Sequence, residues 1–179
     1  MPQPEPLSGH AFGLIADAHV HPGKTPPLPE KLAEIFKGVD RIVALGDMGE
    51  ASGLDTLAKI APVTAIEGED DAHGDSRLAP LRLLECGNVR IAALFDGAKG
   101  GLFVSNDPPR PIDGFETALA RKFGRKPEVL LCAGSHKAFT AHAAGVFIVN
   151  PGSPTLADHP NVTILRIDGT SVCAEQFAL

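Results

Sequence analysis

The chain has 179 residues, of which 44% are hydrophobic and 21% charged, as in an ordinary soluble globular protein. Its net charge of -6 comes from scattered acids and bases, so the sequence lacks the basic patch expected of a protein that binds nucleic acid. It has no run of about 18 apolar residues to span a membrane. Its first residues lack a cationic region followed by an apolar core, so we expect no signal peptide. The three widely spaced cysteines indicate buried thiols in a reducing compartment, and we therefore expect a cytoplasmic protein.

The first part of the chain alternates between buried strands and short helices. Residues 1–11 are polar and rich in proline, and we expect a flexible tail before a single domain that spans residues 12–179. Because helices connect consecutive strands by right-handed crossovers, the pattern that follows predicts a parallel sheet. The expected strands cover residues 12–16, 41–45 and 63–66, and the expected helices cover residues 30–36 and 51–60.

The second part is richer in strands and has one more helix. Residues 86–88 predict a tight turn between two strands of a hairpin. The helical pattern of residues 115–123 has Asp113 as its expected N-cap and Gly124 as its expected stop. The remaining expected strands cover residues 81–85, 89–94, 129–132, 146–149, 162–167 and 172–177, the last two as a closing hairpin.

Polar side chains recur directly after the predicted buried strands. Parallel strands end at one rim of a sheet, so these side chains are expected to gather there. Carboxylates and imidazoles together suit a divalent metal such as Mn, Fe, Zn or Mg, and one carboxylate can bridge two ions about 3.5–4 Å apart. The residues concerned are Asp17 and His19, Asp47, Glu69 with Asp70 and Asp71, Asp96, His136 and Asn150.

Six short motifs carry a resemblance to a known family. They are Asp17-Ala18-His19, Gly46-Asp47, Gly68-Glu69-Asp70-Asp71, Phe95-Asp96-Gly97, Gly134-Ser135-His136-Lys137 and Asn150-Pro151-Gly152-Ser153. In this order the series resembles the calcineurin-like metallophosphoesterases, most closely the small bacterial and archaeal phosphodiesterase branch that includes Vps29. The resemblance implies an α/β fold of the metallo-dependent phosphatase type, a four-layer α/β/β/α sandwich with metals at the strand ends.

The resemblance also implies ligands for two metal ions. Asp17, His19, Asp47 and His136 match the ligands of the first ion, and Asp47 matches the bridging acid. The second set departs from the family pattern, which has Asn at the position of Glu69, His at the position of Asp96, and a further His at the position of Gly134. Glu69 and Asp96 are therefore weaker ligand candidates, and the chain is expected to hold one or two ions.

The activity implied by the resemblance is hydrolysis of a small phosphodiester or phosphomonoester by a metal-activated water. Asp47, Glu69 and Asp96 are the candidate catalytic residues, and the altered second set is expected to slow the reaction or shift the metal preference. The oligomeric state stays open, although the small members of the family often pair and the resemblance therefore allows a homo-oligomer.

Two alternatives stay open. The altered second metal site also fits an inactive protein-binding scaffold like Vps29. Separately, Asp17-Ala18-His19-Val20-His21 resembles the opening of polymerase-and-histidinol-phosphatase domains and of amidohydrolases, in which both imidazoles bind metal. Those proteins are barrels of typically about 250 residues, so this second resemblance is less favoured for a shorter chain.

Overall fold

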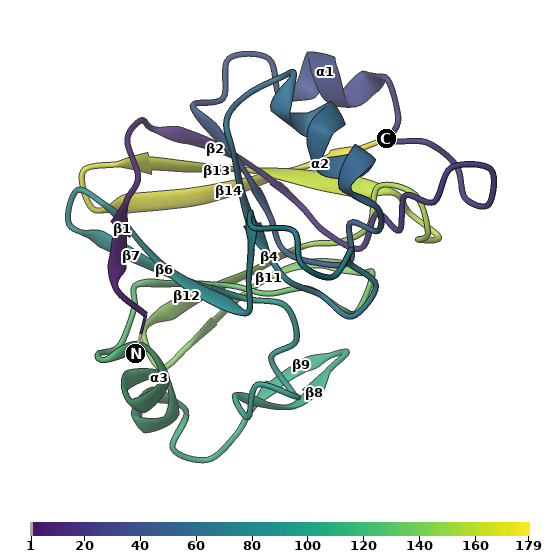
Figure 1. The fold of residues 1–179 in the computed structure, drawn as a ribbon. Coiled ribbons are helices and arrows are strands. Elements are labelled where there is room, and N and C mark those ends of the chain that lie inside the picture. Colours follow the sequence, from purple (N-terminus) through teal and green to yellow (C-terminus); the bar gives the residue numbers. More distant parts are fainter. Residues whose placement is uncertain (1) are drawn as a thin grey trace.

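Two six-stranded sheets pack face to face and carry the helices on their outer sides (Figure 1). The computed structural model describes residues 2–179. In Figure 1, helices α1 and α2 cover one outer side and α3 covers the opposite one. The layers therefore follow the order α/β/β/α, which confirms the predicted four-layer sandwich.

The first sheet contains the predicted parallel core. Strands β2, β3, β4 and β5 run parallel, and β13 pairs antiparallel with both β2 and β14. The predicted β-α-β-α-β beginning and the closing hairpin are thus confirmed. In spatial order the strands are β14 (Ser171–Ala178), β13 (Asn161–Asp168), β2 (Ala11–Ile15), β3 (Arg41–Ala44), β4 (Val63–Ile66) and β5 (Leu78–Ala79), with α1 (Lys31–Ile35) and α2 (Ala51–Ala58) as crossovers.

The second sheet is mixed and carries one helix. The predicted hairpin is formed by β6 and β7, and β10 lies parallel to both β7 and β12. In spatial order the strands are β1 (Pro4–Pro6), β6 (Leu81–Cys86), β7 (Val89–Leu94), β10 (Val129–Leu131), β12 (Val146–Pro151) and β11 (Ala138–Ala143), with α3 (Phe115–Phe123) outside and a separate ribbon of β8 (Phe103–Asn106) and β9 (Pro109–Pro111).

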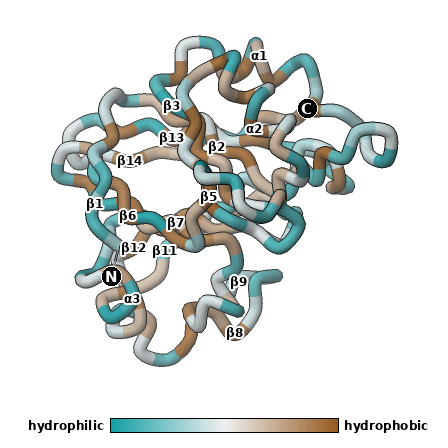
Figure 2. The backbone as a smooth tube through the Cα atoms, in the orientation of Figure 1, coloured by the Kyte–Doolittle hydropathy of each residue, from teal (hydrophilic) through white to brown (hydrophobic). Residues whose placement is uncertain are grey.

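Three apolar clusters hold the layers together. The first lies between the sheets, the second lies under α1 and α2, and the third lies under α3. Strands buried on both faces read as continuous apolar runs, which is why the central strands were predictable and form brown segments in Figure 2. Since the two sheets are stacked and do not close on themselves, the barrel implied by the second resemblance is wrong.

The expectation of a flexible tail is wrong for the residues just before β2. Residues Pro4–Pro6 form β1, which pairs in parallel with Leu83–Glu85 of β6, and Leu7 is buried. Proline argued against a strand, but β1 is an edge strand, where a missing N–H is tolerated. Met1 lies outside the described residues, and the single domain remains a proposal.

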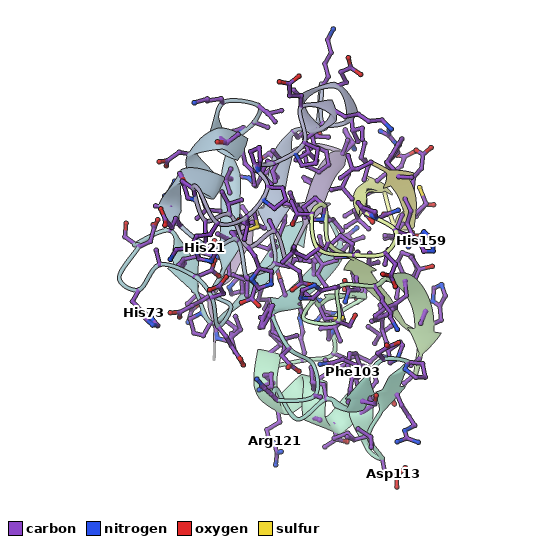
Figure 3. All side chains as sticks on the ribbon, turned by 90° about the vertical axis from the view of Figure 1, so that its right-hand side faces the viewer. His21, His73, Phe103, Asp113, Arg121 and His159 are labelled. Atoms are coloured by element: carbon purple, nitrogen blue, oxygen red, sulfur yellow. The ribbon has the colours of Figure 1, made fainter. Side chains whose placement is uncertain are left out.

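Other sequence predictions also need correction. Gly114, with φ of 73°, is the N-cap of α3, and Asp113 is exposed and makes no capping hydrogen bond; Figure 3 shows it at the outer edge. Gly124 is the C-cap, as predicted.

The expectation of three buried thiols is confirmed for two of the cysteines. Cys86 and Cys132 are buried, whereas Cys173 is exposed. Among residues 2–179, none of the helices has the length and hydropathy needed to cross a membrane.

Candidate metal centre

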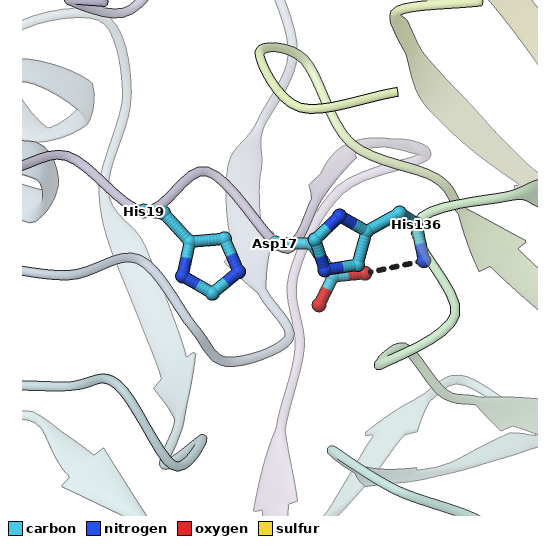
Figure 4. A group of neighbouring side chains, drawn as sticks. All are labelled: Asp17, His19 and His136. Atoms are coloured by element: carbon cyan, nitrogen blue, oxygen red, sulfur yellow. Dashed lines mark hydrogen bonds between the residues drawn. The ribbon is translucent and has the colours of Figure 1, made fainter. Parts of the chain in front are cut away.

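The strand ends of the two sheets meet at one rim and bring three predicted ligands together. Asp17, His19 and His136 each offer a ligand atom within 4.8 Å of the others' (Figure 4). Asp47 lies beside this group, since its Oδ2 is 3.6 Å from Nε2 of His19. Asp17 and His19 follow β2, Asp47 follows β3 and His136 follows β10, so the group spans both sheets.

The backbone at these positions is strained. The φ angles are 50° at Asp17, 46° at His19, 51° at Asp47 and 58° at His136. Among the described non-glycine residues, Ala144 alone shares this positive region. Left-handed conformations of this kind cost energy and cluster at functional sites. The four residues matched to the first metal are therefore also the places where the fold accepts strain.

Asp17 is a fully buried carboxylate held by backbone donors. It accepts hydrogen bonds from the N–H groups of Gly134, at 3.1 Å, and His136, at 3.2 Å, the latter drawn in Figure 4. The Ser153 hydroxyl donates to the Asp17 carbonyl at 2.7 Å. Burial raises the pKa of Asp17 to about 6, although the charge of His136 and these N–H donors oppose the rise.

His19 has one ring nitrogen oriented and the other left without a partner. Its Nδ1 lies 2.6 Å from Oδ2 of Asp70. Its Nε2 is buried and makes no hydrogen bond within residues 2–179. Metal-binding histidines usually have their second nitrogen oriented by a carboxylate or carbonyl in this way. A divalent ion between the three grouped side chains would satisfy the Nε2 atom, so the residues present fit a metal.

His136 shows the same arrangement with a carbonyl in place of the carboxylate. Its Nδ1 lies 3.2 Å from the Leu156 oxygen, which can only accept a hydrogen bond, so Nδ1 is the donor and Nε2 is the ring nitrogen that a metal would take. The two imidazole centroids are 5.2 Å apart. Asn150, fully buried, donates to the Ser135 hydroxyl at 3.1 Å and thereby supports the turn that carries His136.

Asp71 ties the loop after β3 to the loop after β4. Its buried carboxylate accepts four backbone N–H groups at 2.6–3.2 Å, and burial raises its pKa although these bonds lower it. Asp70 in turn donates its N–H to Oδ1 of Asp47 at 2.9 Å, so Oδ2 of Asp47 remains toward His19. The four donors are Asp47, Met48, Gly49 and Gly68.

The weaker candidates Glu69 and Asp96 lie outside the group of three. Glu69 is exposed and forms an ion pair with Lys99. Oδ1 of Asp96 accepts the N–H groups of Ala98, at 2.8 Å, and Lys99, at 2.9 Å, and the amide of Asn106, at 2.6 Å. One oxygen of Asp96 is therefore committed to its own turn, which sequence reasoning did not foresee.

Sequence reasoning also missed the role of Asp70. Its Oδ2 contacts His21 Nε2 at 2.7 Å as well as His19, so His21 is a partner of the orienting carboxylate. The acidic run after β4 was the available signal, but it could not tell which acid faces His19. His73 and His159 are exposed and lie at the outer edges in Figure 3.

Comparisons with known proteins agree with the family resemblance that the sequence motifs carry. Residues 11–170 match the family model described as "Calcineurin-like phosphoesterase superfamily domain". A "Probable metallophosphoesterase" of Methanothermobacter thermautotrophicus is 30% identical over 168 residues, which cover 92% of this chain and 90% of the relative.

Solved structures share the fold. The crystal structure of Chaetomium thermophilum Vps29 has a TM-score of 0.72 at 22% identity and covers 95% of this chain and 98% of its own. A structure described as a novel archaeal phosphodiesterase has a TM-score of 0.66 at 17% identity and covers 94% of this chain and 99% of its own. The family match and the 30% identical relative show that the chain belongs to the calcineurin-like phosphoesterase superfamily, as the motifs predicted.

Proposed function

We propose that the chain is a metal-dependent hydrolase of small phosphate esters, with its principal ion held by Asp17, His19, Asp47 and His136. The observation that carries the proposal is the buried Nε2 of His19, which has no partner among the described residues and faces Asp47 Oδ2 at 3.6 Å. Family membership supports both the divalent ion and the phosphate-ester chemistry.

The chain's own residues prepare the site for such an ion. A bound divalent ion supplies Lewis acidity and lowers the pKa of a water ligand. Backbone N–H groups fix the Asp17 carboxylate, while Asp70 and the Leu156 carbonyl fix the two imidazoles. These side chains therefore need little further ordering when an ion binds. Two imidazoles with two carboxylates suit Mn, Fe or Zn better than Mg, which prefers an all-oxygen shell.

The proposed substrate is a small phosphodiester or phosphomonoester. A cavity of about 510 Å³ opens beside His136 and is lined in part by Lys137, Leu156 and His159. A phosphate at the metal centre would have room there for its organic group, with apolar and cationic side chains in reach. The archaeal phosphodiesterase, which shares the fold, supports the diester class. We also propose that the protein is cytoplasmic and forms a homo-oligomer.

Metal content and hydrolysis test this function together. The purified protein is analysed for bound metal and then assayed with bis-p-nitrophenyl phosphate and p-nitrophenyl phosphate in added Mn²⁺. Asp47→Asn is expected to abolish turnover, because it removes a charged ligand. Asp55→Asn is the matched control, since Asp55 is an exposed acid on α2 that pairs with Arg77. Equal turnover in both variants and the wild type would contradict the proposal.

A protein-binding scaffold is the second candidate function. Among residues 2–179, two large apolar side chains are exposed, Val104 at 59% and Leu156 at 45%, and Leu156 lines the cavity beside His136. The Vps29-like fold supports this candidate as well. A purified protein with neither bound metal nor hydrolysis would favour the scaffold over the hydrolase.

A further inference from the structure

Lys99 places an ammonium group where the second metal's ligands were expected. Its Nζ forms an ion pair with Glu69, which occupies the family's Asn position. Lys99, Glu69 and Asp96 all line one cavity of about 390 Å³ on the β4 and β7 side of the rim. A built-in cation is therefore paired with one of the two weaker ligand candidates, in a cavity that the other one also lines.

The loop that carries Lys99 is fixed by its own hydrogen bonds. The Lys99 N–H donates to Oδ1 of Asp96 at 2.9 Å, and the Gly100 N–H donates to the Asp96 carbonyl at 2.8 Å. A Cβ at Gly97 would come within 2.3 Å of the Phe103 ring, so the loop is also tightly packed. The position of the Lys99 backbone is consequently built into the fold.

Several carboxylates act on the same ammonium. The pKa of Lys99 is raised, first by its hydrogen bond with Glu69 and then by the charges of Glu69, Asp96 and Asp47. Asp47 belongs to the group that would hold the principal ion. Such a cation opposes the entry of a second divalent ion beside it.

Gly134, which stands where the family pattern has a histidine, lies next to the aromatic ring of Phe95. A Cβ at Gly134 would lie 3.4 Å from Cζ of Phe95, and a Cβ at Gly46 would lie 2.6 Å from Cδ2 of the same ring. Phe95 therefore fills space between the loops after β3 and β10, and it has no metal-ligating atom. The imidazole that the family pattern has at position 134 is replaced by packing.

We propose that Lys99 replaces the second metal ion: the chain binds one divalent ion, and the Lys99 ammonium binds an anionic phosphoryl oxygen of the substrate. This inference rests on the proposed function and names the group that completes its site. In the free protein Glu69 neutralises Lys99, and a phosphate competes for the ammonium when it binds. Both side chains are more than 60% exposed, at 65% for Lys99 and 61% for Glu69, so an anion can reach them.

Metal stoichiometry is the first test. Manganese bound per chain is measured by elemental analysis after dialysis, and by the electron paramagnetic resonance spectrum of the Mn²⁺ protein. One ion per chain with the spectrum of an isolated ion is expected. Two ions with a spin-coupled spectrum would overturn the inference and leave the proposed function standing. No bound ion would overturn the proposed function, and this inference with it.

Phosphate binding is the second test, and it uses inorganic phosphate with the Mn²⁺-loaded protein in titration calorimetry. Lys99→Gln is expected to weaken phosphate binding at least about tenfold, because a charge-assisted hydrogen bond is lost, while the manganese content stays at one. Lys99→Arg is expected to retain most of the affinity. Lys126→Gln is the matched control, since Lys126 also forms an exposed ion pair, with Glu116. Equal phosphate affinity of Lys99→Gln and the wild type would overturn the inference.

Discussion

Asp70 orients His19 through a short hydrogen bond, with its Oδ2 2.6 Å from the His19 Nδ1. The same oxygen lies 2.7 Å from Nε2 of His21, so one carboxylate fixes the tautomer of His19 and is itself positioned by a second imidazole. Through this contact the acidic loop after β4 acts on His19, a proposed ligand that follows β2. The proposed metal centre therefore depends on a residue that would not touch the ion.

Replacing Asp70 tests that dependence. We expect Asp70→Asn to weaken Mn²⁺ binding about tenfold or more, because second partners of metal-binding histidines contribute roughly 10–100-fold in affinity. Titration calorimetry with Mn²⁺ measures the effect. Asp55→Asn makes the same chemical change on an exposed acid of α2 and should leave the affinity unaltered. Equal affinities for both variants would mean that Asp70 does not orient His19.

The raised pKa of Asp17 predicts a pH-dependent metal affinity. Burial raises this pKa from 3.8 to about 6, so protons compete with the metal for the carboxylate as the pH falls toward and below 6. We expect the apparent Mn²⁺ affinity to fall steeply between pH 7 and 5, measured by titration in matched buffers. A flat profile across this interval would show that Asp17 is not a ligand.

The same pKa shift predicts the stability of the metal-free protein. A carboxyl group with a raised folded-state pKa binds more protons in the folded state, so its stabilising contribution is complete below pH 3.8 and is lost as the pH rises through about 6. Asp17→Asn removes this loss. We expect the variant to exceed the metal-free wild type in its free energy of unfolding by about 3 kcal/mol at pH 8, and by much less at pH 4, in urea denaturation.

Much of the fold could be predicted because the central strands are continuous apolar runs that end in glycine, proline or acids. The strand β2 and the polar residues Asp17 and His19 after it show how such a run also marks a site. The edge strands could not be predicted, because their sequences are not continuous apolar runs. The strand β1 contains two prolines, and β11 mixes small and polar residues whose burial alternates between intermediate and exposed.

The contacts between loops of the two sheets could not be predicted from the sequence either. Glu69 and Lys99 are separated by 30 positions and lie in loops that follow strands of different sheets, β4 and β7, so their pairing depends on how the sheets stack. No local pattern encodes that relation. By contrast, the ligand candidates Asp17, Asp47 and His136 each follow a strand that local pattern identifies. Sequence thus indicated which residues reach the rim, and the structure shows which of them meet there.

Asp71 is expected to be among the most important polar residues for stability. Its buried carboxylate accepts four N–H groups from the loops after β3 and β4, and each would be left unsatisfied without it. We expect Asp71→Ala to lower the free energy of unfolding by about 3 kcal/mol. Asp113→Ala is the control, since Asp113 is exposed and caps nothing, and it should change stability by less than about 0.5 kcal/mol. Similar values for the two variants would refute this role.

Gly68 is required because the loop after β4 approaches the loop after β3 at its α-carbon. A Cβ at this position would lie 2.2 Å from the backbone nitrogen of Asp47 and 2.3 Å from its Oδ1. Gly68→Ala must therefore displace Asp47. We expect a loss of about 3 kcal/mol in stability, from the strain of overpacking, together with weaker Mn²⁺ binding.

Gly74→Ala separates this steric effect from backbone strain. Gly74 has φ of 86°, and a Cβ there would meet nothing within 4 Å, so only the left-handed backbone opposes the substitution. That strain costs about 1–2 kcal/mol and should leave Mn²⁺ affinity unchanged, because the added methyl group touches no ligand. Urea denaturation and Mn²⁺ titration of both variants give the comparison. If Gly68→Ala binds Mn²⁺ as tightly as the wild type, the displacement of Asp47 does not affect the metal. Asp47 would then not be a metal ligand held in place by the loop after β4.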